Sequence, residues 1–104
     1  MDKYNIAEYL PKTKLKILDY NCGRGETSYF LAKQNKDWTV IGCDTIENLA
    51  QTLEYYSVEY PKQLEPPNII FKPTLAAIKE IFDYVLYCNT KPNVKSSYFI
   101  EIKR

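Results

Sequence analysis

The feature that most constrains the fold of this chain is a glycine turn between two apolar runs, in the stretch LDYNCGRGETSYFLAK of residues 18–33. The run before the turn, LKILDY, is short and has β-branched content, which predicts a strand over 15–20. The run after it, ETSYFLAKQ, is too long for a turn and predicts a helix over 26–34. A strand, a tight turn and a helix in this order form the first part of a βαβ unit.

The rest of the chain continues this alternation. Further strands are predicted over 38–44, 68–72, 82–89 and 97–104, and further helices over 4–10, 45–60 and 74–81. The pattern predicts a Rossmann-like three-layer α/β sandwich, with a mostly parallel sheet of local order 3-2-1-4 and helices on both faces. The final connection shows no helical pattern and is short for a parallel crossover, so we expect the last strand to be an antiparallel edge strand.

The predicted helix over 45–60 follows the second strand directly. Thr45 is its expected N-cap, and Asn48 occupies the position where a capping box carries Glu or Gln. Leu49 and Leu53 lie four positions apart and begin an apolar stripe, which indicates an amphipathic helix.

Residues suited to ligand binding gather at the carboxyl ends of the predicted strands. In an open parallel sheet, ligands bind at that edge, where the strand order reverses. Gly23 and Gly25 let the turn approach a ligand without a Cβ clash, and the following helix offers free N–H groups. Asp44 lies 19 positions after Gly25, close to the spacing at which nucleotide-binding βαβ units carry an acid for the ribose hydroxyls. The pattern predicts a nucleoside-type site.

The segments KILDYNCGRGETSYFLAK and WTVIGCDTIENLAQTL together resemble the first half of a class I S-adenosylmethionine-dependent methyltransferase. That family carries V/I-L-D-x-G-C-G-x-G before a helix and V-x-G-x-D near the end of the second strand. The resemblance covers residues 14 to 89 and is more specific in its first half. It implies a single domain over 1–104 that binds S-adenosylmethionine and lacks the usual C-terminal substrate half of the family.

The resemblance also implies roles for individual residues, although it marks no catalytic one. It places Asp19 near the methionine amino group of the cofactor, and Asn21, Gly23 and Gly25 in the turn beneath the cofactor. It assigns Asp44 to the ribose hydroxyls. The other cofactor-binding positions that it implies are Thr45 and Ile46 beside the adenine, and Cys88 and Asn89 at the end of the fourth strand.

Two positions depart from the family pattern. Asn21 stands where the family has its first glycine. Because asparagine tolerates a positive φ better than most residues, we expect the turn to form around it. After the third strand, Thr74 and Leu75 take the place where the family often has an aspartate near the adenine amino group.

The composition limits the other kinds of site. The chain has no histidine and three cysteines, Cys22, Cys43 and Cys88, all near carboxyl ends of predicted strands. An odd number of cysteines, without a secretory signal, predicts free thiols in a reducing compartment, and their spacing does not indicate a metal site. The net charge of +1 indicates neither nucleic acid nor membrane as a partner. No apolar run approaches the length of a membrane span, and we expect a cytoplasmic, intracellular protein.

Three functions remain open from the sequence. The first is a minimal methyltransferase that acts as a homo-oligomer or with a partner protein; placement of donor and acceptor is its main requirement, so the lack of histidine does not exclude activity. The second is a catalytically inactive methyltransferase-like scaffold or partner subunit, which would use the exposed sheet edge and some of the ten tyrosines at an interface. The third, a different nucleotide-binding module, is disfavoured because N-C-G-R-G-E lacks the full G-x-G-x-x-G spacing.

Overall fold

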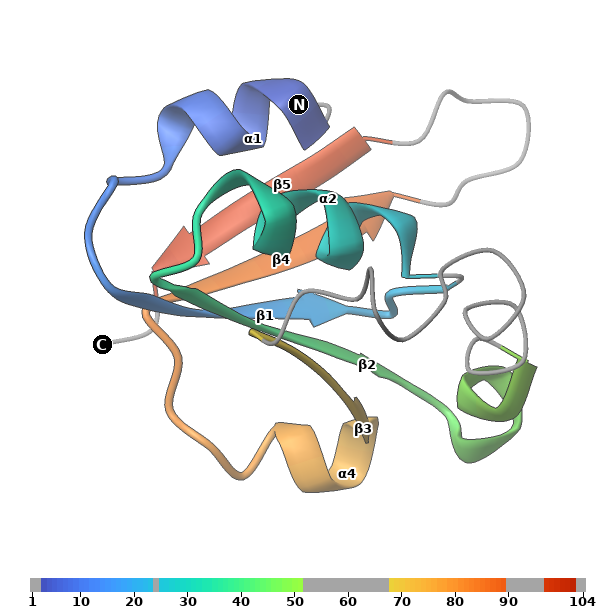
Figure 1. Ribbon diagram of the computed structural model, residues 1–104. Coiled ribbons are helices and arrows are strands. Elements are labelled where there is room, and N and C mark those ends of the chain that lie inside the picture. Colours follow the sequence, from blue (N-terminus) through green and yellow to red (C-terminus); the bar gives the residue numbers. More distant parts are fainter. Residues whose placement is uncertain (1–2, 24, 52–67, 90–96, 103–104) are drawn as a thin grey trace.

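The computed structural model describes residues 3–23, 25–51, 68–89 and 97–102; positions 88, 89 and 97–102 are described by their backbone alone. A five-stranded sheet of order β3-β2-β1-β4-β5 forms the centre (Figure 1). Its strands are β1 (Leu15–Tyr20), β2 (Trp38–Asp44), β3 (Ile69–Pro73), β4 (Tyr84–Asn89) and β5 (Ser97–Ile102). The pairs β1–β2, β1–β4 and β2–β3 are parallel, whereas β5 pairs antiparallel with β4. The predicted order and the antiparallel edge strand are confirmed.

Helices lie on both faces of this sheet, as the strand–helix alternation predicts. α1 (Lys3–Tyr9) and α2 (Glu26–Gln34) lie on one face, and α4 (Thr74–Ala77) lies on the other (Figure 1). Residues 46–51 form a further helical segment after β2. The rest of the helix predicted over 45–60 lies outside the described residues. None of the described helices is long and apolar enough to cross a membrane.

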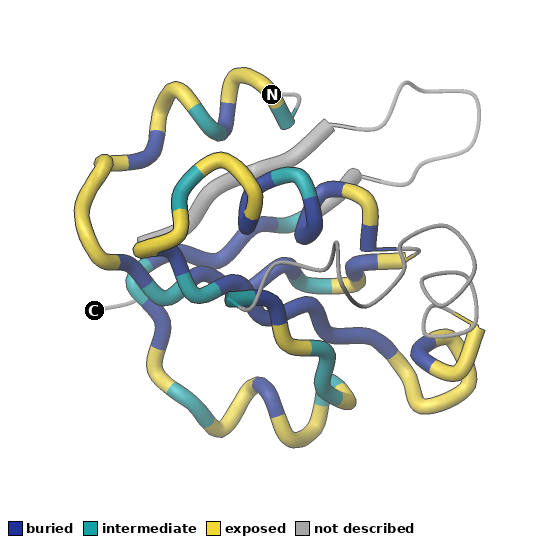
Figure 2. Tube along the Cα trace, in the orientation of Figure 1, coloured by how far each residue is buried: buried dark blue, intermediate teal, exposed yellow. Residues whose placement is uncertain are grey.

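The face under α1 and α2 carries the main core. Successive strand residues point to opposite faces, so alternate residues of the central strands reach this side. Ile17, Val40 and Leu86 come from β1, β2 and β4 and are completely buried there. The indole N–H of Trp38 donates to the carbonyl of Pro11 at 3.0 Å and ties the segment after α1 to β2. Figure 2 shows the central strands as largely buried.

In the described part of the chain, the opposite face is covered only in part, because the helix that lies on it, α4, is short. A second, smaller cluster of buried residues includes Leu18, Phe82 and Val85, and Tyr20 and Tyr87 are partly buried against it. Beside α4 lies a hollow of about 490 Å³, named here the open groove. It is lined by Leu18, Tyr20, Ile78, Glu80, Ile81, Phe82, Val85 and Tyr87.

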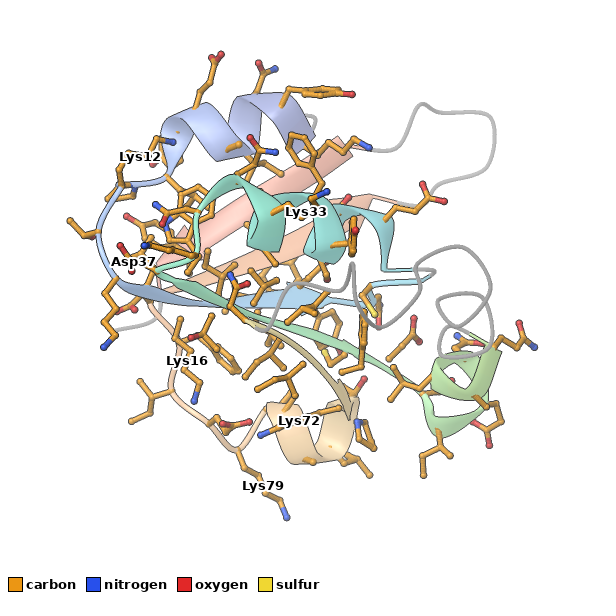
Figure 3. All side chains as sticks on the ribbon, in the orientation of Figure 1. Lys12, Lys16, Lys33, Asp37, Lys72 and Lys79 are labelled. Carbon is orange, nitrogen blue, oxygen red and sulfur yellow. The ribbon has the colours of Figure 1, made fainter. Side chains whose placement is uncertain are left out.

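The helix predicted over 74–81 is shorter in the structure, since α4 ends at Ala77. The N–H of Glu80 bonds to the carbonyl of Ala77, a three-residue spacing typical of a 3₁₀ turn. The carboxylate of Glu80 also accepts bonds from Lys16 at 2.8 Å and Lys72 at 2.7 Å. Figure 3 shows both lysines on the side of the sheet that carries α4. The contact with Lys16 of β1, 64 positions away in the sequence, draws Glu80 toward the sheet, and the eight-residue pattern alone does not reveal it.

The strand predicted over 82–89 begins two residues later, at Tyr84. Phe82 is buried in the second cluster instead of continuing the strand. Asp83 forms a reciprocal pair with the backbone of Lys16: its N–H donates to the Lys16 carbonyl at 2.9 Å, and its carboxylate accepts from the Lys16 N–H at 2.8 Å. This pair aligns the start of β4 with β1.

Candidate cofactor-binding site

The turn after β1 uses the left-handed backbone conformation at three positions. Asn21, Gly23 and Gly25 have φ values of 56°, 57° and 78°. The expectation that Asn21 accepts a positive φ is therefore confirmed. The N–H of Cys22 donates to the carbonyl of Cys43 at 2.9 Å, and the N–H of Gly25 donates to the carbonyl of Cys22 at 2.9 Å. The first bond extends the β1–β2 contact past the end of β1, and the second closes the turn just before α2.

Gly23 connects this turn to the end of β2. Its N–H donates to Oδ2 of Asp44 at 3.1 Å. No heavy atom of the described residues, other than its own neighbours, lies within 4 Å of the position that a Cβ at Gly23 would take. The turn thus leaves open space above a backbone N–H and a carboxylate that lie side by side.

The carboxylate of Asp44 is held in one orientation by several donors. Its Oδ1 accepts from the N–H of Thr45 at 2.8 Å and from the side-chain amide of Asn48 at 2.9 Å. The Thr45 hydroxyl oxygen accepts from the N–H of Asn48 at 3.2 Å, which confirms the predicted N-cap. Sequence reasoning placed Asn48 only in the cap and missed its bond to Asp44. The sequence signal for this bond is the position of Asn48 in the first helical turn, four residues after Asp44.

Asp19 lies in β1, one residue before the strand ends, and is fully buried. Its Oδ2 accepts a hydrogen bond from the hydroxyl of Ser28 at 2.6 Å. Its Oδ1 has no hydrogen-bond partner among the described residues. Burial raises the pKa of Asp19 to about 7, the bond from Ser28 opposes this rise, and the nearby charge of Asp44 adds to it. This carboxylate therefore changes its charge near neutral pH.

Ser28 is a buried member of the site that sequence reasoning missed. It lies on the buried face of α2, and the hydroxyl group opposes Gly42 of β2. A Cβ at Gly42 would lie 3.0 Å from the Ser28 hydroxyl and 2.8 Å from the ring of Phe71. The absence of a side chain at Gly42 thus lets α2 approach the sheet closely enough for Ser28 to reach Asp19. The sequence signal that could have identified Ser28 is a small polar residue three positions after Gly25.

A pocket of about 480 Å³ opens beside Asp44, between the end of β2 and the start of α4. Thr45 and Ile46, predicted to lie beside an adenine, line this β2–α4 pocket together with Thr74 and Leu75. Ile46 and Leu75 are both exposed. Two apolar side chains therefore flank a hollow next to a fixed carboxylate, an arrangement that a flat ring attached to a sugar could fill.

The remaining predicted positions lie at the same edge of the sheet. Cys88 and Asn89 end β4, the parallel neighbour of β1, and their side chains lie outside the described part of the chain. Cys22 and Cys43 are buried free thiols. Burial raises the pKa of both thiols, and the charge of Asp19 raises them further. Both cysteines thus act as small apolar groups, and the roles of all these positions toward a cofactor stay predictions.

Comparison with known proteins finds likeness at the level of structure. No protein-family model matches the sequence, and no curated protein matches it. The Trypanosoma brucei PRMT1 enzyme–prozyme complex with AdoHcy has a TM-score of 0.53 at 16% identity, over 78% of this chain and 25% of that chain. Coclaurine N-methyltransferase, bound to N-methylheliamine and SAH, has a TM-score of 0.49 at 17% identity, over 68% and 21% of the two chains. The antibiotic-resistance methyltransferase Kmr has a TM-score of 0.44 at 20% identity, over 68% and 36%.

The likeness to the trypanosome complex shows that this chain has a class I methyltransferase-like fold. The resemblance noted in the sequence is confirmed at this level. The matched region spans a quarter of the length of that methyltransferase chain.

Proposed function

We propose that this chain binds S-adenosylmethionine as a methyl donor at the edge where β1 and β2 end. One observation carries the proposal: the carboxylate of Asp44, which accepts a hydrogen bond from the Gly23 N–H, lines an open pocket flanked by apolar side chains. Asp44 accepts hydrogen bonds only, which suits the donating hydroxyls of a ribose. The trypanosome complex with the same fold contains AdoHcy, which supports the proposal.

Two features of the protein fit such a donor. The orphan Oδ1 of Asp19 is a buried acceptor without a partner among the described residues, and it suits the methionine ammonium. The turn at Gly23 leaves the space that a Cβ would fill, so a ligand can approach the backbone closely. S-adenosylmethionine supplies a methyl group on a sulfonium, and transfer then depends on placing an acceptor in line with it.

The chain is proposed to form a single methyltransferase-like domain that binds the methyl donor. The binding site for the methyl acceptor is proposed to come from a second copy of the chain or from a partner protein. In the described part of the chain, β5 pairs with β4 on one side only. An unpaired strand edge offers backbone groups to another chain. This edge therefore provides the place where such a partner would join the sheet.

Isothermal titration with S-adenosylmethionine, and with its demethylated product, tests the proposal. We expect one site per chain, and a loss of affinity of about tenfold or more in Asp44→Ala, because hydrogen bonds to a charged group contribute about 1.5–3 kcal/mol. Asp37→Ala is the matched control, since it removes the same charge at the other end of β2 (Figure 3). Wild-type protein that releases no heat with either compound would contradict the proposal.

A second candidate is a catalytically inactive methyltransferase-like scaffold that binds a partner protein. The open groove favours it, because Ile78 and Ile81 are exposed beside the groove. Exposed apolar groups that gather in one place mark interaction surfaces. A defined complex in solution together with flat titrations would support this candidate over the first.

A further inference from the structure

The two carboxylate oxygens of Asp19 have different environments. Oδ2 accepts the hydroxyl of Ser28 at 2.6 Å, whereas Oδ1 is buried without a partner among the described residues. A buried acceptor without a donor costs free energy, and buried polar atoms in native proteins nearly always find a partner. An apolar side chain at this position of β1 would avoid that cost. The orphan oxygen therefore indicates a donor other than the described residues.

Ser28 has little freedom to bond elsewhere. It is completely buried, and α2 holds it against Gly42 of β2, whose missing side chain leaves the space for its hydroxyl. On one side of the Ser28 hydroxyl lies Gly42, where an added Cβ would be only 3.0 Å from the hydroxyl oxygen. On its other side lies the Asp19 carboxylate. The fold thus selects the carboxylate oxygen that the hydroxyl holds.

We propose that Ser28 is a positioning residue for the donor site: its hydroxyl holds Oδ2 of Asp19 and leaves Oδ1 as the acceptor for the cationic amino group of the methyl donor. The inference rests on the proposed cofactor binding and adds a residue to it. Ser28 does not contact the ligand; it acts through Asp19.

Among the described residues, no group near Asp19 supplies a positive charge to pair with Oδ1. Its register partners in the sheet, Gly42 and Leu86, carry no charge. The described titratable groups with an electrostatic interaction with Asp19 are Asp44, Cys22 and Cys43, which are acidic or, as thiols with raised pKa, neutral. A cationic group of a ligand therefore suits the position beside Oδ1 of Asp19. It pairs with Asp19 only when the carboxylate is ionised. Because the Ser28 bond holds down the pKa of Asp19, it controls how much carboxylate is ionised near neutral pH.

The first measurement needs no ligand. Carbon NMR of the Asp19 carboxyl group in the free protein should show a midpoint at about pH 7. In Ser28→Ala the midpoint should rise by about one pH unit or more, because the bond that favours the ionised form is lost. An unchanged midpoint would overturn the inference.

The second measurement is calorimetric titration of S-adenosylhomocysteine between about pH 5.5 and 8.5. Wild-type affinity should fall about tenfold per pH unit below the Asp19 midpoint, because binding requires the ionised carboxylate. In Ser28→Ala the whole profile should move to higher pH, so that affinity lost at neutral pH is largely regained at the alkaline end. A loss of the same size at every pH would show a structural role and overturn the inference, although cofactor binding would stand. No binding by the wild type at any pH would instead contradict the proposed function, and the inference with it.

Two further variants separate the hydroxyl from packing. Ser28→Cys has almost the same shape but a weaker donor. The Asp19 midpoint from NMR and the midpoint of the affinity profile should therefore each lie between the values of wild type and Ser28→Ala. It also keeps the test decisive if Ser28→Ala does not fold. Thr27→Ala removes a buried hydroxyl one position earlier in α2 and should leave both profiles in place. A shift in Thr27→Ala equal to that in Ser28→Ala would contradict a specific role for Ser28.

Discussion

The two faces of the sheet differ in how completely they are covered. On the side of α1 and α2, strand side chains such as Ile17 and Leu86 are fully enclosed. On the side of α4, the open groove leaves Tyr20 and Tyr87 partly exposed, and Ile81, which lines it, is 80% exposed. Parallel strands are joined by crossovers that bring helices onto the sheet, whereas an antiparallel neighbour such as β5 needs none. The antiparallel pairing of β5 thus extends the sheet without requiring a further helix over it.

Asp19 and Ser28, one part of the candidate cofactor site, belong to the covered face, whereas the β2–α4 pocket lies beside the start of α4. Asp19 and Gly42 alternate with Leu18 and Ile41 of the second cluster along β1 and β2, and they lie on the side of α2, which also carries Ser28. Functional groups held by packed elements keep their geometry better than groups on a poorly covered surface. The covered face therefore suits the part of the donor site around Asp19, and the open groove is available for another contact.

The largest expected difference between the faces comes from two neighbouring residues of β1. Ile17 and Leu18 have side chains of equal volume on opposite faces, 0% and 3% exposed. Ile17→Ala should lower the free energy of unfolding by about 3–4 kcal/mol, because it leaves a closed cavity. Leu18→Ala should cost about 2 kcal/mol, because water can enter from the open groove. Urea unfolding measures both, and equal losses would contradict the asymmetry.

The next effect concerns the pH dependence of stability on the covered face. The pKa of Asp19 is raised from 3.8 to about 7, so the folded protein binds this proton more tightly than the unfolded chain does. The stabilisation that Asp19 contributes to the folded protein is present below about pH 4 and is lost as the pH rises through about 7. Between about pH 5 and 7 the loss is roughly 2–3 kcal/mol. Asp19→Asn should remove this slope in unfolding curves recorded across that range. A slope that persists would show that other groups cause it.

A smaller effect is expected at the turn that borders the open groove. Hydrogen bonds from Lys16 and Lys72 lower the pKa of Glu80. The stability that Glu80 contributes to the fold is therefore present above the ordinary carboxyl pKa and is lost as the pH falls through the lowered pKa. Glu80→Gln should lower the melting temperature slightly at neutral pH, and less in high salt, because both ion pairs are solvent-accessible. The same shift in strong acid would mean that the ion pairs are not its cause.

The smallest effect should come from Ile81, at the rim of the open groove. Ile81→Lys should change the free energy of unfolding by less than about 0.5 kcal/mol, because the side chain is already in solvent. Thermal unfolding of the isolated protein measures it, with Leu18→Ala as the reference inside the groove. A large destabilisation would show that Ile81 is covered in solution and would weaken the contrast between the faces.

Much of the fold could be predicted from local patterns. The strand–turn–helix around Gly23, the second strand ending at Asp44 and the antiparallel edge strand each leave a signal within a few neighbouring residues. Asn21 is the clearest case at the site, because its tolerance of a positive φ is a property of the residue itself. The end of α4 could not be predicted this way, because Glu80 after it pairs with Lys16 of β1, 64 positions away in the sequence.

The sequence by itself determined the elements, their order and the residues that meet at one edge, because periodicity and turn chemistry act over short distances. Only the tertiary structure decided which carboxylate oxygen of Asp19 is held and which is left free. That choice depends on how closely α2 approaches β2 at Gly42, a distance set by packing between elements. The uneven cover of the sheet was likewise decided in three dimensions, since it results from where each helix comes to lie.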